Sequence, residues 1–415
     1  MYIRVFATLA LVIPGVIAAI NIAIDPYSFF GTKMAPGFNV MKPELANHEK
    51  ELKVHRLTTL RPDGLILGSS ASAVGFDPEH PGWSAETVYS LGVGRSSISL
   101  AHHFLLHAME FQTPKQVVLG LELGMFNPTL QTAQGINPAA FAVTKDGKRN
   151  REYLALNYFA TAFSLDMLAS SFTTFAVNRK NPVLPSDHRP QISAVGMINP
   201  ESSPVNRWKT FRNRFQAMVA VHVDRFWAPL DRFNAIEEFS DDPTFKVFQD
   251  IVRLACENEI ELYIVFSPTH AYLLEAQEAA GLTELWERWQ KAVVYGTVNR
   301  PDGPGCKSIS VWDFSGYNEF TTEIIAESND ASDAPQGYWD PVHYRKWLGD
   351  IMLNRVFDVE NMANPNDFGV MLTPDNIDGH IAATRERAVQ YRNSHPEEVS
   401  LVNETVKATL KTESK

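Results

Sequence analysis

Two short segments, about 270 residues apart, carry side chains that acyl transfer requires. The first is the Gly-Ser-Ser turn at residues 68–70, which follows an apolar run at residues 64–67. The second is the Asp-Pro-Val-His segment at residues 340–343. A serine hydroxyl becomes a useful nucleophile when an imidazole takes its proton and a carboxylate orients that imidazole. The chain has all three groups, and its acid and base come from a single turn.

The elements around these segments alternate between strands and helices. Apolar runs predict five strands, at residues 64–67, 87–91, 115–123, 260–266 and 309–314. Stretches with apolar residues at helical spacing separate them. This rhythm predicts an α/β fold with a doubly wound, parallel, five-stranded sheet of the flavodoxin-like kind. Ligands of such sheets bind at the carboxyl ends of the strands, where both chemical segments fall.

The chain divides into six predicted parts. They are a transmembrane anchor or signal segment at 1–25, a linker with a helix at 26–60, the α/β domain at 61–126 and 243–360, a mainly helical insertion at 127–242, and a polar C-terminal helix and tail at 361–415. The last 15 residues of the tail are expected to be loose. Two distant stretches must therefore fold together to complete the sheet.

The N-terminus predicts export. Residues 5–24 form an uncharged apolar run preceded by Arg4, long enough to span a bilayer as a helix. The positive charge of Arg4 favours a cytoplasmic N-terminus. We expect an inner-membrane anchor with the main domain in the periplasm or outside. The alternative is secretion after signal cleavage, for which Ala18 and Ala19 offer a site.

Composition excludes several classes of protein. The 415 residues are 45% hydrophobic and 20% charged, as in a globular protein. A net charge of -11 without a basic cluster argues against a nucleic-acid partner. The two cysteines, Cys256 and Cys306, make no disulfide framework and no four-ligand zinc site. Cys256 is expected to be a buried core thiol, although a single bridge between the two stays open. No metal and no cofactor are predicted.

The segments resemble motifs of the SGNH (GDSL-type) hydrolase superfamily. Residues 68–70 look like the first block, which implies that Ser70 is the nucleophile. Residues 89–92 resemble the second block, in which the glycine, here Gly92, lends a backbone N–H to the oxyanion hole. Residues 340–343 match the last block, in which His343 would be the general base and Asp340 would orient it.

A more specific likeness is to an exported, membrane-anchored branch that acts on cell-envelope polymers. This branch includes alginate O-acetyltransferase-like proteins and the D-alanyl transfer protein of teichoic acids. The shared traits are the apolar N-terminal helix, the Gly-Ser/Thr-Ser turn and an Asp-x-x-His-Tyr segment, here residues 340–344. The likeness covers residues 60–125 and 245–356 and leaves out the insertion and the tail.

The oxyanion of a tetrahedral intermediate needs fixed hydrogen-bond donors. The N–H groups of Ser70 and Gly92 are candidates, because glycine lets the backbone approach closely. Ser69 and Ser72 are rival nucleophiles.

The third block departs from the family pattern. A family member has an asparagine just after the third strand, whereas this chain has Glu122 there and no asparagine before Asn127. The third donor is therefore absent, replaced, or supplied by Asn127. Glu122 is expected to bind substrate or to lie in a structural pair. Arg95 and His270, which also follow strands, are further candidates for contact with the substrate.

These features predict an exported serine acyl esterase or O-acyltransferase. Its substrate would be a carbohydrate or cell-envelope polymer, modified through an acyl-Ser70 intermediate. A membrane-bound acyl donor is an expected partner for transfer. The alternative is a non-catalytic polysaccharide-binding or assembly component. Its groove would be lined by aromatic residues of the insertion, namely Tyr153, Tyr158, Phe159 and Trp208.

Overall fold

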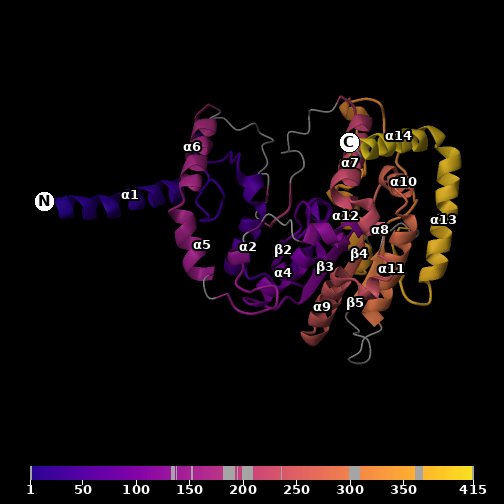
Figure 1. Ribbon diagram of the computed structural model, residues 1–415, viewed down its shortest axis with the longest axis horizontal. Helices are drawn as coiled ribbons and strands as arrows, with labels where there is room; N and C mark the ends of the chain where they lie inside the picture. Colours follow the sequence, from indigo (N-terminus) through magenta and orange to yellow (C-terminus); the bar gives the residue numbers. More distant parts are fainter. Residues whose placement is uncertain are drawn as a thin grey trace.

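The protein is built around one six-stranded sheet (Figure 1). The computed structural model describes residues 2–131, 136, 138–150, 153–180, 192–193, 195–198, 209–234, 236–298, 309–359 and 368–413. The strands lie in the order β2-β1-β3-β4-β5-β6. They are β1 (Gly64–Leu67), β2 (Val88–Ser90), β3 (Gln116–Leu121), β4 (Glu261–Phe266), β5 (Ile309–Asp313) and β6 (Val370–Leu372).

The five predicted strands are present and parallel to one another. Every residue of β1, β2 and β3 is buried, as expected for a parallel sheet covered on both faces. The prediction of five strands in total was wrong, because β6 adds an antiparallel edge beside β5. Its three residues are too few to show a period-two pattern in the sequence.

Helices before, between and after the parallel strands cover the sheet. They are α2 (Glu49–Leu60), α3 (Ser70–Gly75), α4 (Ile98–Met109), α9 (Pro243–Glu257), α10 (Ala271–Ala279), α11 (Thr283–Val298) and α12 (Lys346–Val356). α9 begins where the Asp242 carboxylate accepts the Thr244 N–H at 2.7 Å, with Pro243 in the first turn. The buried face of α9 packs against α4, whereas α12 packs against α3.

The part of the insertion that the structure describes is mainly helical. Its helices are α5 (Tyr153–Ala162), α6 (Leu165–Lys180), α7 (Phe211–His222) and α8 (Leu230–Asn234), with a π-helical turn at Val223–Trp227. The sequence of the insertion predicts helical pieces at 154–175 and 203–226, but the first is broken before Leu165. There the Ser164 hydroxyl accepts the N–H of Met167 at 3.2 Å, which starts a new helix. The first part of the helix expected at 203–226 lies outside the described residues.

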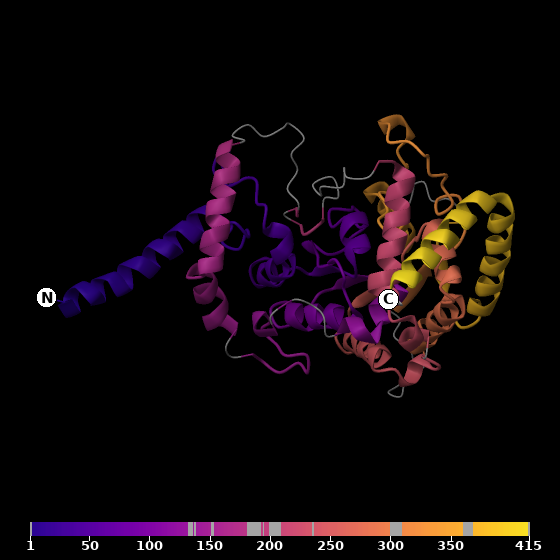
Figure 2. The ribbon, with the colours of Figure 1, turned by 45° about the horizontal axis from the view of Figure 1, so that its top comes forward.

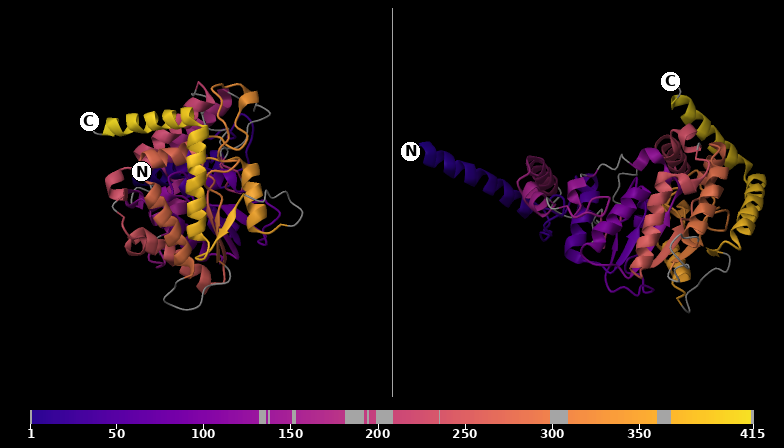
Figure 3. Two further views of the ribbon diagram at one scale, coloured as in Figure 1. Left: turned by 90° about the vertical axis from the view of Figure 1, so that its right-hand side faces the viewer. Right: turned by 60° about the horizontal axis from the view of Figure 1, so that its bottom comes forward.

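Two helices, α13 (Ile377–Ser394) and α14 (Pro396–Glu413), follow β6 and wrap one end of the molecule (Figure 3). The expectation of a loose tail was wrong. α14 packs against α7 and α10 through Val402 and Val406, both 1% exposed. These valines recur at helical spacing, and their apolar face is what holds the tail in place.

The N-terminal helix α1 (Tyr2–Ile24) projects away from the sheet (Figures 1 and 2). Among the described residues it is the one helix long and apolar enough to cross a membrane. Only 11% of its most apolar window is buried.

The state of Cys256 differs from the prediction. It lies partly exposed near the end of α9 and is disulfide-bonded, so it is not a buried core thiol. Cys306, the other cysteine of the chain, lies outside the described residues.

Candidate active site

The turn between β1 and α3 places Ser70 at the carboxyl edge of the sheet. Gly68 has φ +140°, and a Cβ there would lie 2.7 Å from the Gly120 carbonyl oxygen, so the turn requires glycine. Ser69 caps α3, since its hydroxyl accepts the N–H of Ala71 at 3.0 Å. Ser70 is thereby fixed in the first helical residue, with its side chain only partly buried.

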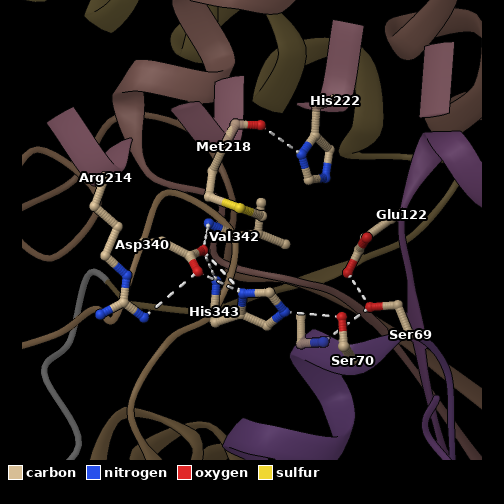
Figure 4. Close-up of polar contacts among 10 residues, drawn as sticks. Ser69, Ser70, Glu122, Arg214, Met218, His222, Asp340, Val342 and His343 are labelled. Carbon is tan, nitrogen blue, oxygen red and sulfur yellow. Dashed lines mark hydrogen bonds and ion pairs between the residues drawn. The ribbon is translucent and has the colours of Figure 1, made fainter. Parts of the chain in front are cut away.

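Asp340, His343 and Ser70 form one hydrogen-bonded chain (Figure 4). His343 Nδ1 lies 2.9 and 2.8 Å from the two carboxylate oxygens of Asp340. His343 Nε2 lies 2.8 Å from Ser70 Oγ. Because the carboxylate accepts a proton from Nδ1, Nε2 keeps its lone pair and accepts from the serine hydroxyl. The three side chains predicted from the sequence are therefore brought together.

The turn that carries the acid and the base is not helical. Asp340 Oδ1 accepts the N–H groups of Val342 and His343, each at 3.0 Å, which closes a tight turn around the carboxylate. Trp339 N–H donates to the His343 carbonyl at 2.8 Å, and α12 begins only at Lys346. The two backbone hydrogen bonds thus hold the Asp340 carboxylate in position independently of the His343 imidazole.

The charges of the pair stabilise each other. Burial would raise the pKa of Asp340, but the neighbouring His343 and Arg214 hold this pKa well below its usual range. Burial would lower the pKa of His343, but the Asp340 carboxylate outweighs it and the net pKa is raised above 6.5. Arg214 reaches the site from α7, with Nη2 3.8 Å from Asp340 Oδ2. The acid stays ionised and the base is ready to hold a proton.

Gly92 lies against the start of α3. A Cβ at Gly92 would lie 2.7 Å from both the Ser69 carbonyl oxygen and the Ala73 nitrogen, so only glycine allows this approach. Among the described residues, the N–H groups of Gly92 and Ser70 have no hydrogen-bond acceptor. Two backbone donors are therefore available near the serine.

A buried lysine holds the loop of Gly92. Lys53 of α2 is fully buried, and its Nζ donates to the Gly92 carbonyl oxygen. The same ammonium lies 3.2 Å from Glu49 Oε1. Burial lowers the pKa of Lys53, although Glu49 opposes this. The sequence gives no hint of this role, since Lys53 is one of several charged residues in its helix.

Asn127 does not fit the oxyanion role that its position suggested. It is buried, and its side-chain N–H groups donate to the carbonyls of Phe226 and Ala228 at 2.9 and 3.1 Å. Its side-chain oxygen accepts from Thr129. Both donors are committed to the insertion, so Asn127 fastens the π-helical turn to the sheet edge.

Glu122 lies beside the nucleophile turn. Ser69 Oγ and Glu122 Oε1 are 2.5 Å apart, and burial raises the pKa of the carboxyl group. The pair agrees with the structural alternative for Glu122; contact with a substrate stays a prediction. A cavity of about 50 Å³ adjoins it, lined by Ser69, Glu122, His222 and Val342 together with core aromatics. His222 Nδ1 donates to the Met218 carbonyl at 3.0 Å, and burial lowers the pKa of His222 to about 4. A neutral imidazole and a buried carboxyl group thus form the polar end of this cavity.

The structure does not favour Ser69 or Ser72 as the nucleophile. Ser69 is engaged with Glu122, and Ser72 is completely buried beneath the turn. Of the three serines, Ser70 is the one with a hydrogen bond to the imidazole of His343.

His270 does not line the site as predicted. It is completely buried, its Nδ1 accepts the Tyr272 N–H at 3.2 Å, and its Nε2 donates to the Glu323 carbonyl at 2.8 Å. Nδ1 thus caps α10, and Nε2 ties its start to the loop of Glu323. Arg95, by contrast, is exposed just after the Gly92 loop, with φ +56°, and its contact with a substrate stays a prediction.

The expected aromatic groove is not found in the part of the insertion that the structure describes. Tyr153 is 3% exposed and belongs to the core. Phe159 is exposed, but on α5, beside α1. Trp208 and the side chain of Tyr158 lie outside the described residues.

Besides Lys53, sequence reasoning missed two further site residues, Arg214 and His222. Both belong to α7, whose sequence has no recognisable motif. Helical spacing places them on one face, eight residues apart, but which face meets the sheet depends on tertiary packing. No protein-family model matches this chain, and no curated protein sequence matches it either.

Proposed function

We propose that this chain is a membrane-anchored serine acyl esterase or O-acyltransferase with an SGNH-like, flavodoxin-like fold. The observation that carries the proposal is the continuous hydrogen-bonded chain from Asp340 through His343 to Ser70. The order of the parallel strands, 2-1-3-4-5, supports it, since flavodoxin-like sheets share this order and bind ligands at the same edge. The substrate would be a carbohydrate or cell-envelope polymer.

In the first step, Ser70 Oγ attacks the carbonyl carbon of an ester while His343 Nε2 takes the hydroxyl proton. Asp340 stabilises the imidazolium that forms. The carbonyl oxygen becomes an oxyanion, for which the N–H groups of Ser70 and Gly92 are the donors. Each such donor typically contributes about 10²–10³ to the rate. Lys53 keeps the second donor in place through the Gly92 carbonyl.

The tetrahedral intermediate then collapses. Its bond to the leaving oxygen breaks, and His343 gives that oxygen the proton, which leaves an acyl ester on Ser70. In the second step a hydroxyl group attacks the acyl carbon while His343 takes its proton. Water as the acceptor gives an esterase, and a sugar hydroxyl gives a transferase. His343 finally returns the proton to Ser70 Oγ.

The remaining parts of the proposal concern location and partners. The exposed, apolar α1 supports attachment to a membrane. A domain held outside the inner membrane would meet envelope polymers, and a membrane-bound donor could supply its acyl group.

The test is ester turnover by the full-length protein in detergent, with 4-nitrophenyl acetate as the probe. Ser70→Ala should reduce turnover to the background rate. Ser72→Ala is the matched control, since this serine is two residues away, buried and outside the hydrogen-bonded chain. Turnover by folded Ser70→Ala equal to that of the wild type would reject the proposal. Absent turnover in all three proteins, with measurable glycan binding, would favour the non-catalytic alternative.

A further inference from the structure

Helix α6 buries several polar side chains and exposes several apolar ones. Its buried residues include Ser171, Thr174 and Asn178, whose side chains are polar. Its outward residues include Leu165 and Phe172, which are 68% and 58% exposed. With the exposed Ala169 and Ala176, these residues recur at intervals of four, three and four, so they form one apolar stripe. A helix facing only water would have the opposite arrangement.

Two polar side chains on the buried face of α6, those of Asn178 and Ser171, have hydrogen-bond partners. Asn178 accepts the N–H groups of Val40 and Met41, each at 3.0 Å, and donates to the Met41 carbonyl. Ser171 Oγ lies 3.2 Å from Asn21 Oδ1 of α1. These partners fix the rotation of α6, so the apolar stripe cannot turn inward.

The stripe continues onto α5. Phe159 and Phe163 are 67% and 42% exposed, and their rings stack with centroids 6.4 Å apart. Exposed aromatic residues that adjoin one another mark a contact with another molecule or a membrane, unlike single scattered ones. We call the set Phe159, Phe163, Leu165 and Phe172 the α5–α6 apolar surface.

This surface is tied to the base of the membrane-type helix. The buried Asn21 of α1 donates to the carbonyls of Ala162 and Ser164 at 2.9 and 3.0 Å, in the connection between α5 and α6. In Figures 1 and 2 the α5–α6 pair runs across the base of α1. A bilayer crossed by α1 would therefore have α5 and α6 lying along its surface.

We propose that the α5–α6 apolar surface is embedded in the interfacial layer of the same bilayer that α1 crosses. The occupant of the surface is lipid. The packing of α5 and α6 against α1 favours lipid, and α6 ends in the exposed Arg179 and Lys180, which suit anionic headgroups. Two points of attachment, one spanning and one lying flat, would fix the orientation of the sheet relative to the membrane. The proposal is independent of the chemistry at Ser70.

The test measures membrane contact in the full-length protein. Phe172→Cys is labelled with a polarity-sensitive nitrobenzoxadiazole dye, after reconstitution in nanodiscs of phosphatidylcholine and phosphatidylglycerol. Described residues include no free cysteine, so labelling is directed to the new site. Val389→Cys is the matched control, because Val389 is also apolar, 55% exposed and on α13, at the end of the molecule opposite α1 (Figure 1).

The dye at position 172 should be quenched by spin-labelled lipid, and iodide should quench it at least about threefold less than the dye at 389. Equal iodide quenching at both positions in folded protein would overturn the proposal. Protection of position 172 only in native membranes, and not in pure lipid, would also overturn it and would indicate a protein partner instead. Leu165→Cys gives a second position, should Phe172→Cys fail to fold.

Discussion

Asp340→Asn is the most informative single substitution at the site. Asp340 Oδ1 accepts two backbone N–H groups at 3.0 Å, so an asparagine would place its only acceptor oxygen there. Its amide nitrogen would then take the position of Oδ2, 2.8 Å from His343 Nδ1. The remaining amide oxygen, although 2.9 Å from Nδ1, has both lone pairs used by the N–H groups of Val342 and His343. Two donors cannot face each other at the other position, so Nδ1 would lose its proton and Nε2 would carry it. A protonated Nε2 cannot accept the proton of Ser70.

The expected loss follows from this change of tautomer. A wrong tautomer in a serine triad costs about 10⁴-fold in kcat, or roughly 5 kcal/mol of barrier. KM should change little, because Asp340 is buried behind the imidazole and would not touch substrate. The assay is steady-state turnover of 4-nitrophenyl acetate by the full-length protein.

Asp313→Asn is the matched control for Asp340→Asn. Asp313 is also a buried carboxylate paired with a histidine, with Oδ2 2.7 Å from His380 Nε2. It ties β5 to α13 and has no contact with Ser70 or His343 in the described structure. Its variant should lose stability while kcat of the folded protein stays near the wild-type value. A loss below tenfold for Asp340→Asn, or equal losses for both variants, would refute the reasoning.

Three further outcomes are expected. Because His343 must be neutral to accept a proton and its pKa is raised, kcat/KM should rise with pH through a midpoint above 6.5. Asp340→Asn should lower that midpoint, because the carboxylate no longer opposes the effect of burial on the pKa of His343; an unmoved midpoint would contradict this. Asn127→Ala should lower the free energy of unfolding by about 1–3 kcal/mol in chemical denaturation. A fall in its kcat of about 10² would instead restore the oxyanion role. Gly92→Ala should lower kcat at least about tenfold, because the added Cβ would displace the loop from Ser69. An unchanged kcat in this variant would show that the Gly92 N–H does not stabilise the oxyanion.

The triad was predictable because its parts obey rules that act along the sequence. An apolar run followed by Gly68 predicts a strand and a turn, and parallel strands bring their carboxyl ends to one edge. Ser70 and the Asp340 turn therefore had to approach each other once the sheet was recognised. The parallel strands β1, β3, β4 and β5 were predictable because each has four to six residues and shows its apolar character. β2 has only three residues and was found as part of the longer run at 87–91.

Residues whose role depends on where the side chain points were not predictable. Asn127 and His270 also follow strands, but their donors are used by the nearby Phe226 and Glu323 carbonyls. A sequence shows that a side chain is near the sheet edge, but not where it points. Lys53 and Arg214 come from helices whose approach to the site is set by packing. β6 and α14 were missed because short or polar elements give a weak periodic signal.

The most direct measurement of the central claim is the mass of the peptide containing Ser70 after the full-length protein reacts with a fluorophosphonate. An activated serine should give a covalent adduct on Ser70 in the wild type and none in His343→Ala. The hydrogen bond of 2.8 Å from Ser70 Oγ to His343 Nε2 is the basis of this expectation. An unmodified Ser70 in folded wild-type protein, or an adduct that persists in His343→Ala, would contradict it.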